Sequence, residues 1–445
     1  MARADDEANG VLGAYVDAPQ LMLRVRRADL DRLPHHEIEA FRLRAARALL
    51  ARQAQRIPVL RDKLGDRSPD DFVELNQLVD LLLRPDEYKS YGENWLRDGN
   101  FAALTEWMAG FTAHDYSGLD VSACASVTDW CQALKAQAGD HICHSSGTSG
   151  VVGFLPRSAR DGATQADAML WHYQPFGGDL GYHPGEANEV VFAVPQPRRQ
   201  FRQPTQYADN LEQRYGMPVL MLPVYFGPEH FIAQGKVRTA QRRGTLDQLN
   251  DPIVDAFQDE VKAYQDSLPA RLEAWSQELL DKHTGRRVII QMTSDIAWRL
   301  TRILQARGVR GAFAPGSVYA IGGGVKDGSS MPDDWLDQLR DVFGADADSF
   351  CSMYGMSEVN VQLRECPAGM YHATPFIIPF ILDPATGEPL PRTGVQTGRF
   401  AVLELLSADN WGGLITDDRA TIDWDTPCAC GSVGPLVDPR SIGRI

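Results

Sequence analysis

The chain has 445 residues, of which 44% are hydrophobic and 23% are charged, and its formal net charge is −15. This is the composition of a globular protein long enough for two or three packed units. An acidic chain offers no general basic surface, so nucleic acid is not expected as a partner. The N-terminus lacks the apolar core of a signal peptide, and no run of 18 apolar residues predicts a membrane span.

The chain contains seven cysteines, an odd number. Disulfide frameworks are typical of small secreted domains, so this number in a long chain favours free thiols or a metal site in a reducing compartment. We therefore expect a cytoplasmic protein.

Residues 1–140 are predicted to form a helical cover that packs on the core. Apolar residues recur at helical spacing over 38–49, and Pro58 ends that helix. Further helices are expected around residues 72–83, 95–108 and 127–136. Four arginines lie mostly off the apolar face of the first helix, and we interpret them as its solvated side rather than as a basic patch: Arg42, Arg44, Arg47 and Arg52.

Residues 141–374 are predicted to form an α/β core. Short apolar runs predict buried strands at 189–194 and 218–223, and a helical tract over 254–283 contains Pro269, which should break or kink it. Strands and amphipathic helices then alternate: strand 287–292, helix 296–307, strand 317–321, helix 332–343 and strand 349–353. This alternation predicts a largely parallel sheet whose ligands lie at the carboxyl ends of its strands.

The texture changes again in residues 375–445. Short strands at 376–382, 398–406 and 419–424 are separated by turns rich in proline and glycine. This pattern predicts a small antiparallel β unit.

One stretch, residues 145–153, is rich in glycine and hydroxyl groups and reads Ser-Ser-Gly-Thr-Ser-Gly-Val-Val-Gly. Backbone N–H groups and hydroxyls of such a loop suit a polyphosphate, although a plain flexible Ser/Gly loop has the same composition. The lysine of a Walker loop is missing, which argues against a P-loop phosphotransferase.

Four further motifs follow in order: Gly322-Gly323-Gly324, Tyr354-Gly355-Met356-Ser357-Glu358, Thr416-Asp417-Asp418 and Gly443-Arg444. Over about residues 140–445 this series resembles the adenylate-forming (acyl-activating, ANL) superfamily. Two branches look closest: the phenylacetate–coenzyme A ligases, with Tyr-Gly-x-Ser-Glu and a late Cys-x-Cys-Gly, and the acyl-protein synthetases of bacterial luminescence, with Ser-Ser-Gly-Thr-Ser-Gly. The resemblance implies the α/β fold of their large N-terminal domain, with two α/β subdomains, mostly parallel sheets and a small antiparallel β unit.

The resemblance also implies a reaction. A carboxylic acid, aryl or fatty, would be activated by ATP and Mg²⁺ to an acyl-AMP with release of pyrophosphate. The acyl group would then pass to a thiol, which belongs to coenzyme A, to a carrier protein or to a cysteine of the chain itself. Positioning and charge neutralisation supply most of such phosphoryl chemistry.

The resemblance assigns roles to residues of this chain. The loop residues would bind the β- and γ-phosphates, namely Ser145, Ser146, Gly147, Thr148, Ser149 and Gly150. Adenine would lie between Gly322–Gly324 and Tyr354, with Gly355 and Met356 beside it. Ser357 would meet the phosphate, Glu358 would hold Mg²⁺, and Thr148 joins these two as a catalytic candidate. Asp418, with Asp417 as competitor, would accept from the ribose hydroxyls, and Arg444 would mark the hinge.

Each of these residues also has an ordinary interpretation. Tyr354 alone suits a core aromatic, Glu358 a solvated residue at a helix start, and the two aspartates a turn. It is the occurrence of all the motifs together, in order and after predicted strands, that favours the functional interpretation.

The sequence departs from the family pattern at three places. The usual Gly-Lys-Pro after the loop is absent, which leaves Arg157 or Arg160 as the replacement charge unless both are surface residues. The usual Thr-Gly-Asp has become Thr416-Asp417-Asp418. The chain ends at Ile445, where the family hinge begins, so we expect the mobile C-terminal domain to be absent. That expectation implies slow adenylation, a second chain that supplies the domain, or a different second step. It also keeps open another function, a catalytically weak nucleotide- or acyl-binding partner subunit.

Cys366, His372, Cys428 and Cys430 form a second group of interest. Three thiolates and one imidazole suit a structural tetrahedral Zn²⁺, although their spacing is not that of a standard zinc finger. The phenylacetate-ligase-like branch has a similar Cys/His layout. The competing hypothesis is that Cys428 or Cys430 accepts the acyl group, as a late cysteine does in the luminescence synthetases. The two roles exclude each other.

Other candidates follow from composition. His172, His183 and His230 lie among aromatic residues, and one of them is expected to contact the substrate carboxylate. Residues 171–185 and 194–202 are expected to line the acyl pocket.

Overall fold

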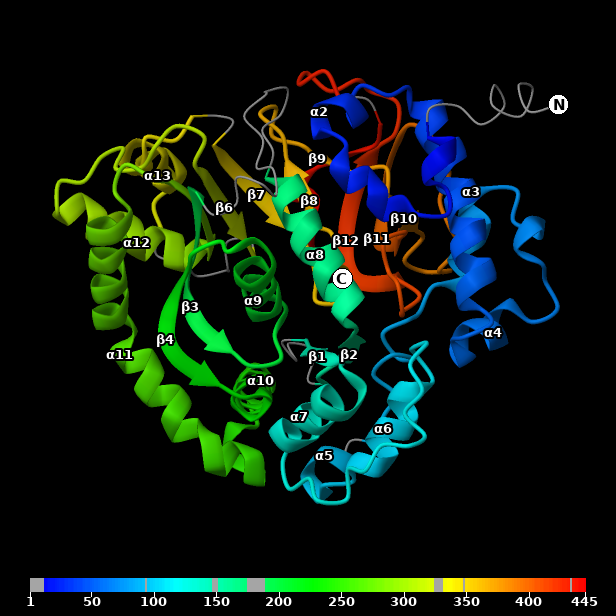
Figure 1. Ribbon diagram of the computed structural model, residues 1–445, viewed down its shortest axis with the longest axis horizontal. Helices are drawn as coiled ribbons and strands as arrows, with labels where there is room; N and C mark the ends of the chain where they lie inside the picture. Colours follow the sequence, from blue (N-terminus) through cyan, green and yellow to red (C-terminus); the bar gives the residue numbers. More distant parts are fainter. Residues whose placement is uncertain are drawn as a thin grey trace.

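Figure 1 shows the computed structural model, which describes residues 12–92, 94–145, 151–173, 189–323, 331–346, 349–432 and 434–445. Its α-helices are α2 (Arg27–Leu30), α3 (His35–Gln53), α4 (Pro58–Leu64), α5 (Trp95–Asp98), α6 (Phe101–Ala109), α7 (Val127–Ala138), α8 (Ala159–His172), α9 (Gln203–Tyr215), α10 (Pro228–Arg243), α11 (Pro252–His283), α12 (Ser294–Ala306) and α13 (Trp335–Phe343).

Its strands are β1 (His141–His144), β2 (Phe154–Arg157), β3 (Val190–Arg199), β4 (Val219–Phe226), β5 (Arg287–Thr293), β6 (Val318–Gly322), β7 (Phe350–Tyr354), β8 (Leu363–Glu365), β9 (Tyr371–His372), β10 (Ile377–Leu382), β11 (Val395–Glu404), β12 (Gly413–Asp423), β13 (Leu436–Val437) and β14 (Gly443–Arg444). The predicted strands and helices of the α/β core and of the antiparallel part are confirmed within a few residues at their ends.

Within the described residues, twelve strands form one mixed sheet in the order β10-β11-β12-β13-β9-β8-β7-β6-β5-β3-β4, with β14 paired to β12. The strands from β3 to β7 pair in parallel. From β7 onward to β10 the pairing is antiparallel. β1 and β2 form a separate antiparallel hairpin. The predicted α/β fold class with a parallel core and an antiparallel extension is therefore confirmed.

The parallel half of the sheet is covered by helices on both faces, as β3 shows. Val190, Phe192 and Val194 pack with α8 and α9. Val191 and Ala193, which alternate with them, pack with α11, α12 and α13 on the opposite face. Figure 1 shows α11 and α12 along the outer side of this half and α9 on the inner side. Because successive strand residues point to opposite faces, such a continuous apolar run requires both coverings. The carboxyl ends of the strands stay open for a ligand.

The N-terminal helices and the antiparallel half share one apolar core, formed by residues of the 12–82 region together with residues of 359–437. Figure 1 shows α3 beside β10 and β11. Arg42 fastens this junction, because its guanidinium donates to the carbonyl oxygens of Ala373 (3.0 Å), Thr374 (2.8 Å) and Pro375 (3.3 Å). The interpretation of Arg42 as a solvated residue is wrong. These three carbonyls, far away in sequence, need donors, and a fully buried arginine supplies them.

One local prediction needs correction: residues 75–81 form a 3-10 helix, whereas a helix over 72–83 was expected. Of the two outcomes expected for Pro269, a break or a kink, the break does not occur, because α11 runs from Pro252 to His283 with the proline inside it. A proline removes one hydrogen bond, and burial of Leu272, Trp275 and Leu279 on the following turns holds the helix in place.

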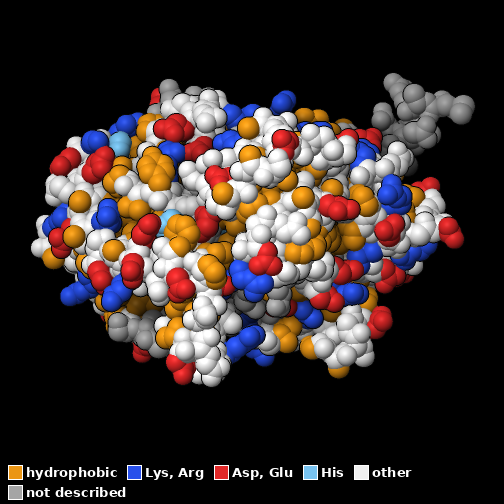
Figure 2. All heavy atoms as spheres, turned by 90° about the horizontal axis from the view of Figure 1, so that it is seen from below, with side chains coloured by type: hydrophobic (Ala, Val, Ile, Leu, Met, Phe, Trp, Pro, Cys, Tyr) orange, Lys and Arg blue, Asp and Glu red, His pale blue; other side chains and the backbone are white. Residues whose placement is uncertain are grey.

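Helices of a length and hydropathy that would cross a lipid bilayer do not occur among the described residues. The face of the molecule in Figure 2 carries acidic and basic side chains interspersed with apolar ones. On this face the net charge of −15 is therefore not concentrated in a single patch.

Candidate active site

A cavity of about 470 Å³ lies at the carboxyl ends of β3, β5, β6 and β7. This volume is within the range of small-molecule sites. The cavity is lined by eleven residues of the predicted motifs: Ser145, Gly322, Gly323, Gly355, Met356, Ser357, Glu358, Thr416, Asp417, Asp418 and Arg444. Six others lie outside the described residues: Ser146, Gly147, Thr148, Ser149, Gly150 and Gly324.

The first residue of the glycine-rich stretch is fixed by the β1–β2 hairpin. The Ser145 amide donates to the Gly153 carbonyl oxygen, and the Gly153 amide donates to the Ser145 hydroxyl oxygen, both at 2.8 Å. These reciprocal bonds continue the register of the hairpin, in which His144 faces Phe154. The stretch is thereby held at both of its ends beside the cavity.

Gly322 and Gly323 bring the end of β6 to the cavity wall. Gly323 has a φ of +83°, a conformation that side-chain-bearing residues rarely adopt, so glycine is required at the turn. The neighbouring strand β5 ends with Gln291, Met292 and Thr293, which also line the cavity. Sequence reasoning missed these three residues, although their position at the end of a predicted parallel strand was a sufficient signal.

Tyr354, the last residue of β7, contacts Asp418, which lines the cavity. Its hydroxyl donates to Asp418 Oδ2 at 2.8 Å, and its ring packs edge-on against Phe400 with the centroids 5.6 Å apart. Burial raises the pKa of Tyr354, and the nearby Asp418 carboxylate adds to this, so the hydroxyl stays protonated and donates. Pairing of β12 with β14 sets Asp418 opposite Arg444, and the Arg444 Nε lies 3.4 Å from Asp418 Oδ1.

Asp417, the competing candidate, points to a different partner. Its Oδ1 lies 2.9 Å from Arg399 Nη2 on β11. Both aspartates of the Thr-Asp-Asp motif line the cavity, and both are neutralised by an arginine of the antiparallel half.

Glu358 has a different environment from these aspartates. No ion pair within 4.0 Å is found for its carboxylate among the described residues. Burial raises the pKa of the Glu358 carboxyl above its usual range, while the positive charges of Lys89 and Arg202 act in the opposite direction. It is thus an acidic group in the cavity wall, half-buried and near cations, with no direct charge partner in the described chain.

Hydrogen bonds from the buried Arg157 hold the loop that carries Ser357 and Glu358. The Arg157 guanidinium donates to the carbonyl oxygens of Ser357 and Val359 (3.1 Å for the latter) and to Asn360 Oδ1. The amide of Asn360 in turn donates to Glu404 Oε2 at 2.5 Å. Arg157 was one of two residues proposed to replace the missing lysine. Its guanidinium is instead engaged with this loop, and the other, Arg160, is exposed.

Besides Arg444, three cations line the cavity that sequence reasoning did not select as charged site residues: Lys89, Arg199 and Arg202. Lys89 lies in the segment before α5. Arg199 ends β3 and Arg202 is the N-cap of α9, within the stretch expected to line the acyl pocket. The two arginines follow a predicted strand, which could have indicated that they lie at the cavity. No sequence pattern indicates the same for Lys89.

Neither of the two candidate histidines that the structure describes lines this cavity. His172 is fully buried at the end of α8, and burial holds its pKa well below the usual range. His230 faces Glu260 at 2.8 Å and lies against the ring of Phe226. His183 lies outside the described residues. Of the two expected pocket segments, Val194, Gln196, Arg199 and Arg202 line the cavity, and Trp171 packs in the core against Phe376 instead.

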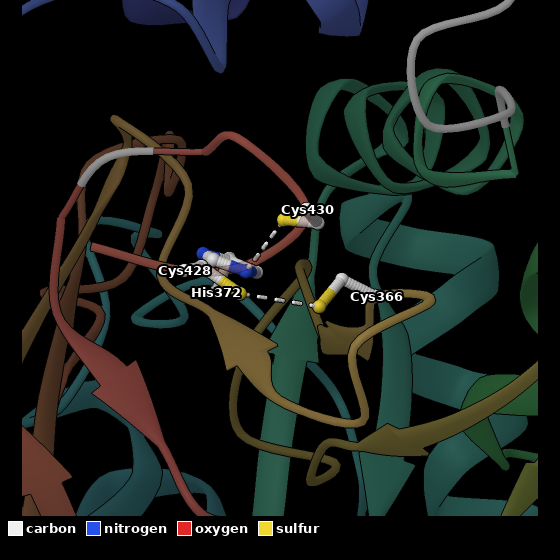
Figure 3. Close-up of side chains that lie close together, drawn as sticks. All are labelled: Cys366, His372, Cys428 and Cys430. Carbon is white, nitrogen blue, oxygen red and sulfur yellow. Dashed lines mark hydrogen bonds between the residues drawn. The ribbon is translucent and has the colours of Figure 1, made fainter. Parts of the chain in front are cut away.

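The antiparallel half brings together four candidate metal ligands, Cys366, His372, Cys428 and Cys430 (Figure 3). Cys366 follows β8 and His372 ends β9, while the two other cysteines lie between β12 and β13. Their ligand atoms all lie within 4.8 Å of one another, with Cys366 Sγ 3.7 Å from Cys428 Sγ and Cys430 Sγ 3.4 Å from His372 Nε2.

Those two distances match the edges of a metal tetrahedron. Zinc–sulfur bonds of about 2.3 Å and zinc–nitrogen bonds of about 2.0–2.1 Å give edges of roughly 3.8 Å between sulfurs and roughly 3.6 Å between sulfur and nitrogen. The residues therefore fit Zn²⁺ in number and type, and these two ligand-to-ligand distances are those of a tetrahedral site. None of the four is among the described residues that line the cavity.

No protein-family model matches the sequence, and no curated protein matches it. Solved structures do share its fold. The open conformation of 2-hydroxyisobutyryl-CoA ligase, in complex with 2-HIB-AMP and CoA, has a TM-score of 0.51 at 14% identity, covering 93% of this chain and 76% of that chain. The same ligase in the thioesterification state has a TM-score of 0.52 at 15% identity, covering 93% and 69%. ATP-bound MatB from Rhodopseudomonas palustris is less similar, with a TM-score of 0.39 at 15% identity, covering 66% of this chain and 47% of that chain.

At such low identity the similarity establishes the fold and not the activity. The chain has the α/β fold of the large N-terminal domain of adenylate-forming enzymes, as the resemblance of its motifs implied.

Proposed function

We propose that the protein activates a carboxylic acid with ATP, forming an acyl-AMP and pyrophosphate, and that the acyl group then passes to a thiol such as that of coenzyme A. One observation carries this proposal. Motifs between Ser145 and Arg444 supply eleven residues to a single cavity at the strand ends of an acyl-CoA ligase fold. Separate ordinary roles for these residues would not require them to meet.

The roles of the residues follow from their positions. Gly322 and Gly323 offer a wall without side chains, which suits a flat adenine base, and Tyr354 precedes Gly355 on the neighbouring strand end. Asp418 accepts hydrogen bonds from the ribose hydroxyls, with Arg444 beside it. Ser145 and Ser357 meet the phosphates, and Thr148 is assigned to the same task from its motif alone.

Glu358 is proposed to hold Mg²⁺, because a carboxylate with no ion pair in the described chain supplies the oxygen ligand that this cation prefers. When bound, the ion would neutralise phosphate charge. Lys89 supplies positive charge to the same side of the cavity. It would replace the lysine that is missing after the glycine-rich loop.

The four Cys/His residues are proposed to bind a structural Zn²⁺ rather than to accept the acyl group. The tetrahedral spacing of the ligand atoms supports the metal. The absence of these cysteines from the described lining of the cavity weakens the acyl-acceptor alternative, since the acceptor sulfur has to reach the acyl-AMP. Bound zinc would join the β8–β9 turn to the segment between β12 and β13.

ATP–pyrophosphate exchange over a panel of aryl, arylacetic, fatty and dicarboxylic acids tests the main proposal. We expect exchange that depends on one class of acid. No exchange with any acid, together with measurable ATP binding, would contradict the proposed activity and favour a nucleotide-binding partner subunit.

Metal analysis tests the zinc proposal. Protein purified without chelators should contain about one zinc per chain, and Cys428→Ser should lose it while the conservative variant Cys351→Ser, at a buried cysteine outside the cluster, keeps it. Protein without zinc would refute the proposed site. A trapped acyl-thioester at Cys428 or Cys430 would establish the alternative.

A further inference from the structure

Arg199 and Arg202 bring two positive charges to one side of the cavity. Neither has a carboxylate within 4.0 Å among the described residues. The third arginine of the described cavity wall differs in this respect, since Arg444 lies 3.4 Å from Asp418. Two neighbouring half-buried cations without a carboxylate in the described chain are costly, so such a pair indicates a place for an anion.

Both side chains are held in position by neutral groups. Their guanidinium carbons lie 4.7 Å (Arg199) and 5.1 Å (Arg202) from the ring centroid of Phe231 on α10. Arg202 also donates to the carbonyl oxygen of His144 at 2.7 Å. Among the described residues, no hydrogen-bond partner is found for the buried Nε of Arg199. The aromatic ring orients the charges without neutralising them.

The charge of Arg199 is disfavoured by its surroundings. Burial lowers the pKa of Arg199 to about 10, and the charge of Arg202 contributes in the same direction. The neighbour that favours the charge is the phenol of Tyr264, which is itself neutral because burial raises its pKa. An anion bound here would therefore gain an attraction that no described residue supplies.

The two arginines face different parts of the cavity. Arg202 interacts with Glu358, on the side of the proposed phosphate and Mg²⁺ site. Arg199 pairs with Phe226 of β4, whose ring packs against Tyr264 of α11 with the centroids 5.0 Å apart. Arg199 therefore lies toward the β4–α11 side, whereas Arg202 donates to the carbonyl oxygen of His144 beside Ser145.

We propose that Arg199 binds a second carboxylate on the acid that is activated, so that the substrates are dicarboxylic acids. This inference rests on the proposed function, because it names the substrate class of the same cavity. Arg202, nearer to Glu358, serves the reacting carboxylate and the phosphates. A planar guanidinium donates two parallel hydrogen bonds to a carboxylate, and the Nε of Arg199, which has no partner in the described chain, is one of the donors that such a pair uses.

The test compares acids of equal length that differ in one carboxylate, such as pentanedioic with pentanoic acid and terephthalic with 4-methylbenzoic acid. In ATP–pyrophosphate exchange, kcat/KM should favour the dicarboxylic member by at least about 10-fold, the usual contribution of a charge-assisted pair. Arg199→Met should abolish this preference and leave the KM for ATP unchanged. Arg199→Lys should restore part of it.

Arg198→Met provides the matched control. Arg198 is the preceding residue of β3, and its guanidinium is paired with Asp209 and Glu212 instead of lining the cavity. This variant should keep the preference for dicarboxylic acids. Melting temperatures of all variants show whether a loss reflects misfolding.

Three results would overturn the inference. One is a wild-type preference for the monocarboxylic acids. Another is an equal loss of exchange with both members of each pair in Arg199→Met, which would assign Arg199 to the reacting carboxylate or to the phosphates. If no acid supports exchange, the proposed function fails, and calorimetric titration with pentanedioate and pentanoate still decides the question. Binding of pentanedioate that Arg199→Met removes supports the anion site, and equal or absent binding of the two acids refutes it.

Discussion

The two halves of the sheet treat charge differently. In the antiparallel half and its N-terminal helices, arginines are neutralised within the protein: Arg399 by Asp417, Arg444 by Asp418, and Arg392 by Glu39. At the ends of the parallel strands, Arg199, Arg202 and Glu358 have no ion-pair partner in the described chain. Charges of the first kind are compensated within the protein, whereas those of the second kind are available to a ligand.

This difference predicts where substitutions act. Removing a buried group of the antiparallel half or of its N-terminal helices that does not line the cavity should cost stability, whereas removing a group that lines the cavity should cost activity. The following predictions test this division, starting with the largest expected effect.

Glu358→Ala should reduce acid-dependent pyrophosphate exchange by at least about 100-fold, since it removes the proposed metal ligand and the charge stabilisation that depends on it. The free energy of unfolding should change by less than about 0.5 kcal/mol, because no ion pair of the described chain is lost. Exchange kinetics and urea unfolding measure both. Full activity in this variant would show that the metal assignment is wrong.

Arg42→Met should have the opposite profile. Three buried carbonyl oxygens lose their donor, so the free energy of unfolding should fall by about 3 kcal/mol. Because Arg42 does not line the cavity, the KM for ATP of the folded protein should be unchanged. Arg52→Met, at an exposed position of the same helix, should cost less than about 0.5 kcal/mol. A similar cost for both would mean that the junction contributes little.

Glu404 links the two halves and should make stability depend on pH. Burial raises the pKa of Glu404 to about 7, so between its ordinary value and pH 7 the folded protein binds a proton that the unfolded chain releases. Stability from this group is therefore present at low pH and is lost as the pH rises through 7. Relative to Glu404→Gln, the wild-type free energy of unfolding should fall by up to about 3 kcal/mol between pH 4.5 and pH 8. Parallel pH profiles of the two proteins would refute this assignment.

Tyr354→Phe should give the smallest effect. The variant keeps the ring and loses only the hydroxyl that donates to Asp418 at 2.8 Å, which is worth about 1 kcal/mol. The Kd for ATP should therefore rise by about fivefold, and Tyr354→Ala should raise it further. If the Phe variant binds ATP as the wild type does, then Asp418 does not depend on Tyr354 for its orientation.

Much of the fold was predictable from local patterns. Alternating apolar runs and amphipathic helices in residues 287–353 predicted the parallel strands because each strand is covered on both faces and each helix on one. The motifs Gly322-Gly323 and Tyr354 to Glu358 follow those strands directly. Their place in the cavity then follows from the rule that parallel strands end at one edge of the sheet.

The four candidate zinc ligands could also be selected from the sequence, whereas their arrangement in space could not. Cys366 and His372 lie near each other in the chain, but their approach to Cys428 and Cys430 depends on the pairing of β9 with β13. A pairing between segments some 60 residues apart leaves no periodic trace in the sequence, so only the folded chain fixes the spacing of the four ligand atoms.

The sequence by itself determined the α/β class, the succession of strands and helices along the chain and the motif residues at the strand ends, because these depend on local periodicity and on the direction of parallel strands. The tertiary structure alone decided the order of the strands in the sheet and the surroundings of the charged side chains. It brought Lys89 to the cavity, left Arg199 and Arg202 there without carboxylates of the described chain within 4.0 Å, and buried Arg42 against carbonyls more than 300 residues away. Whether a charged side chain is solvated, paired or open to a ligand depends on the groups that surround it in space, and no local pattern specifies those groups.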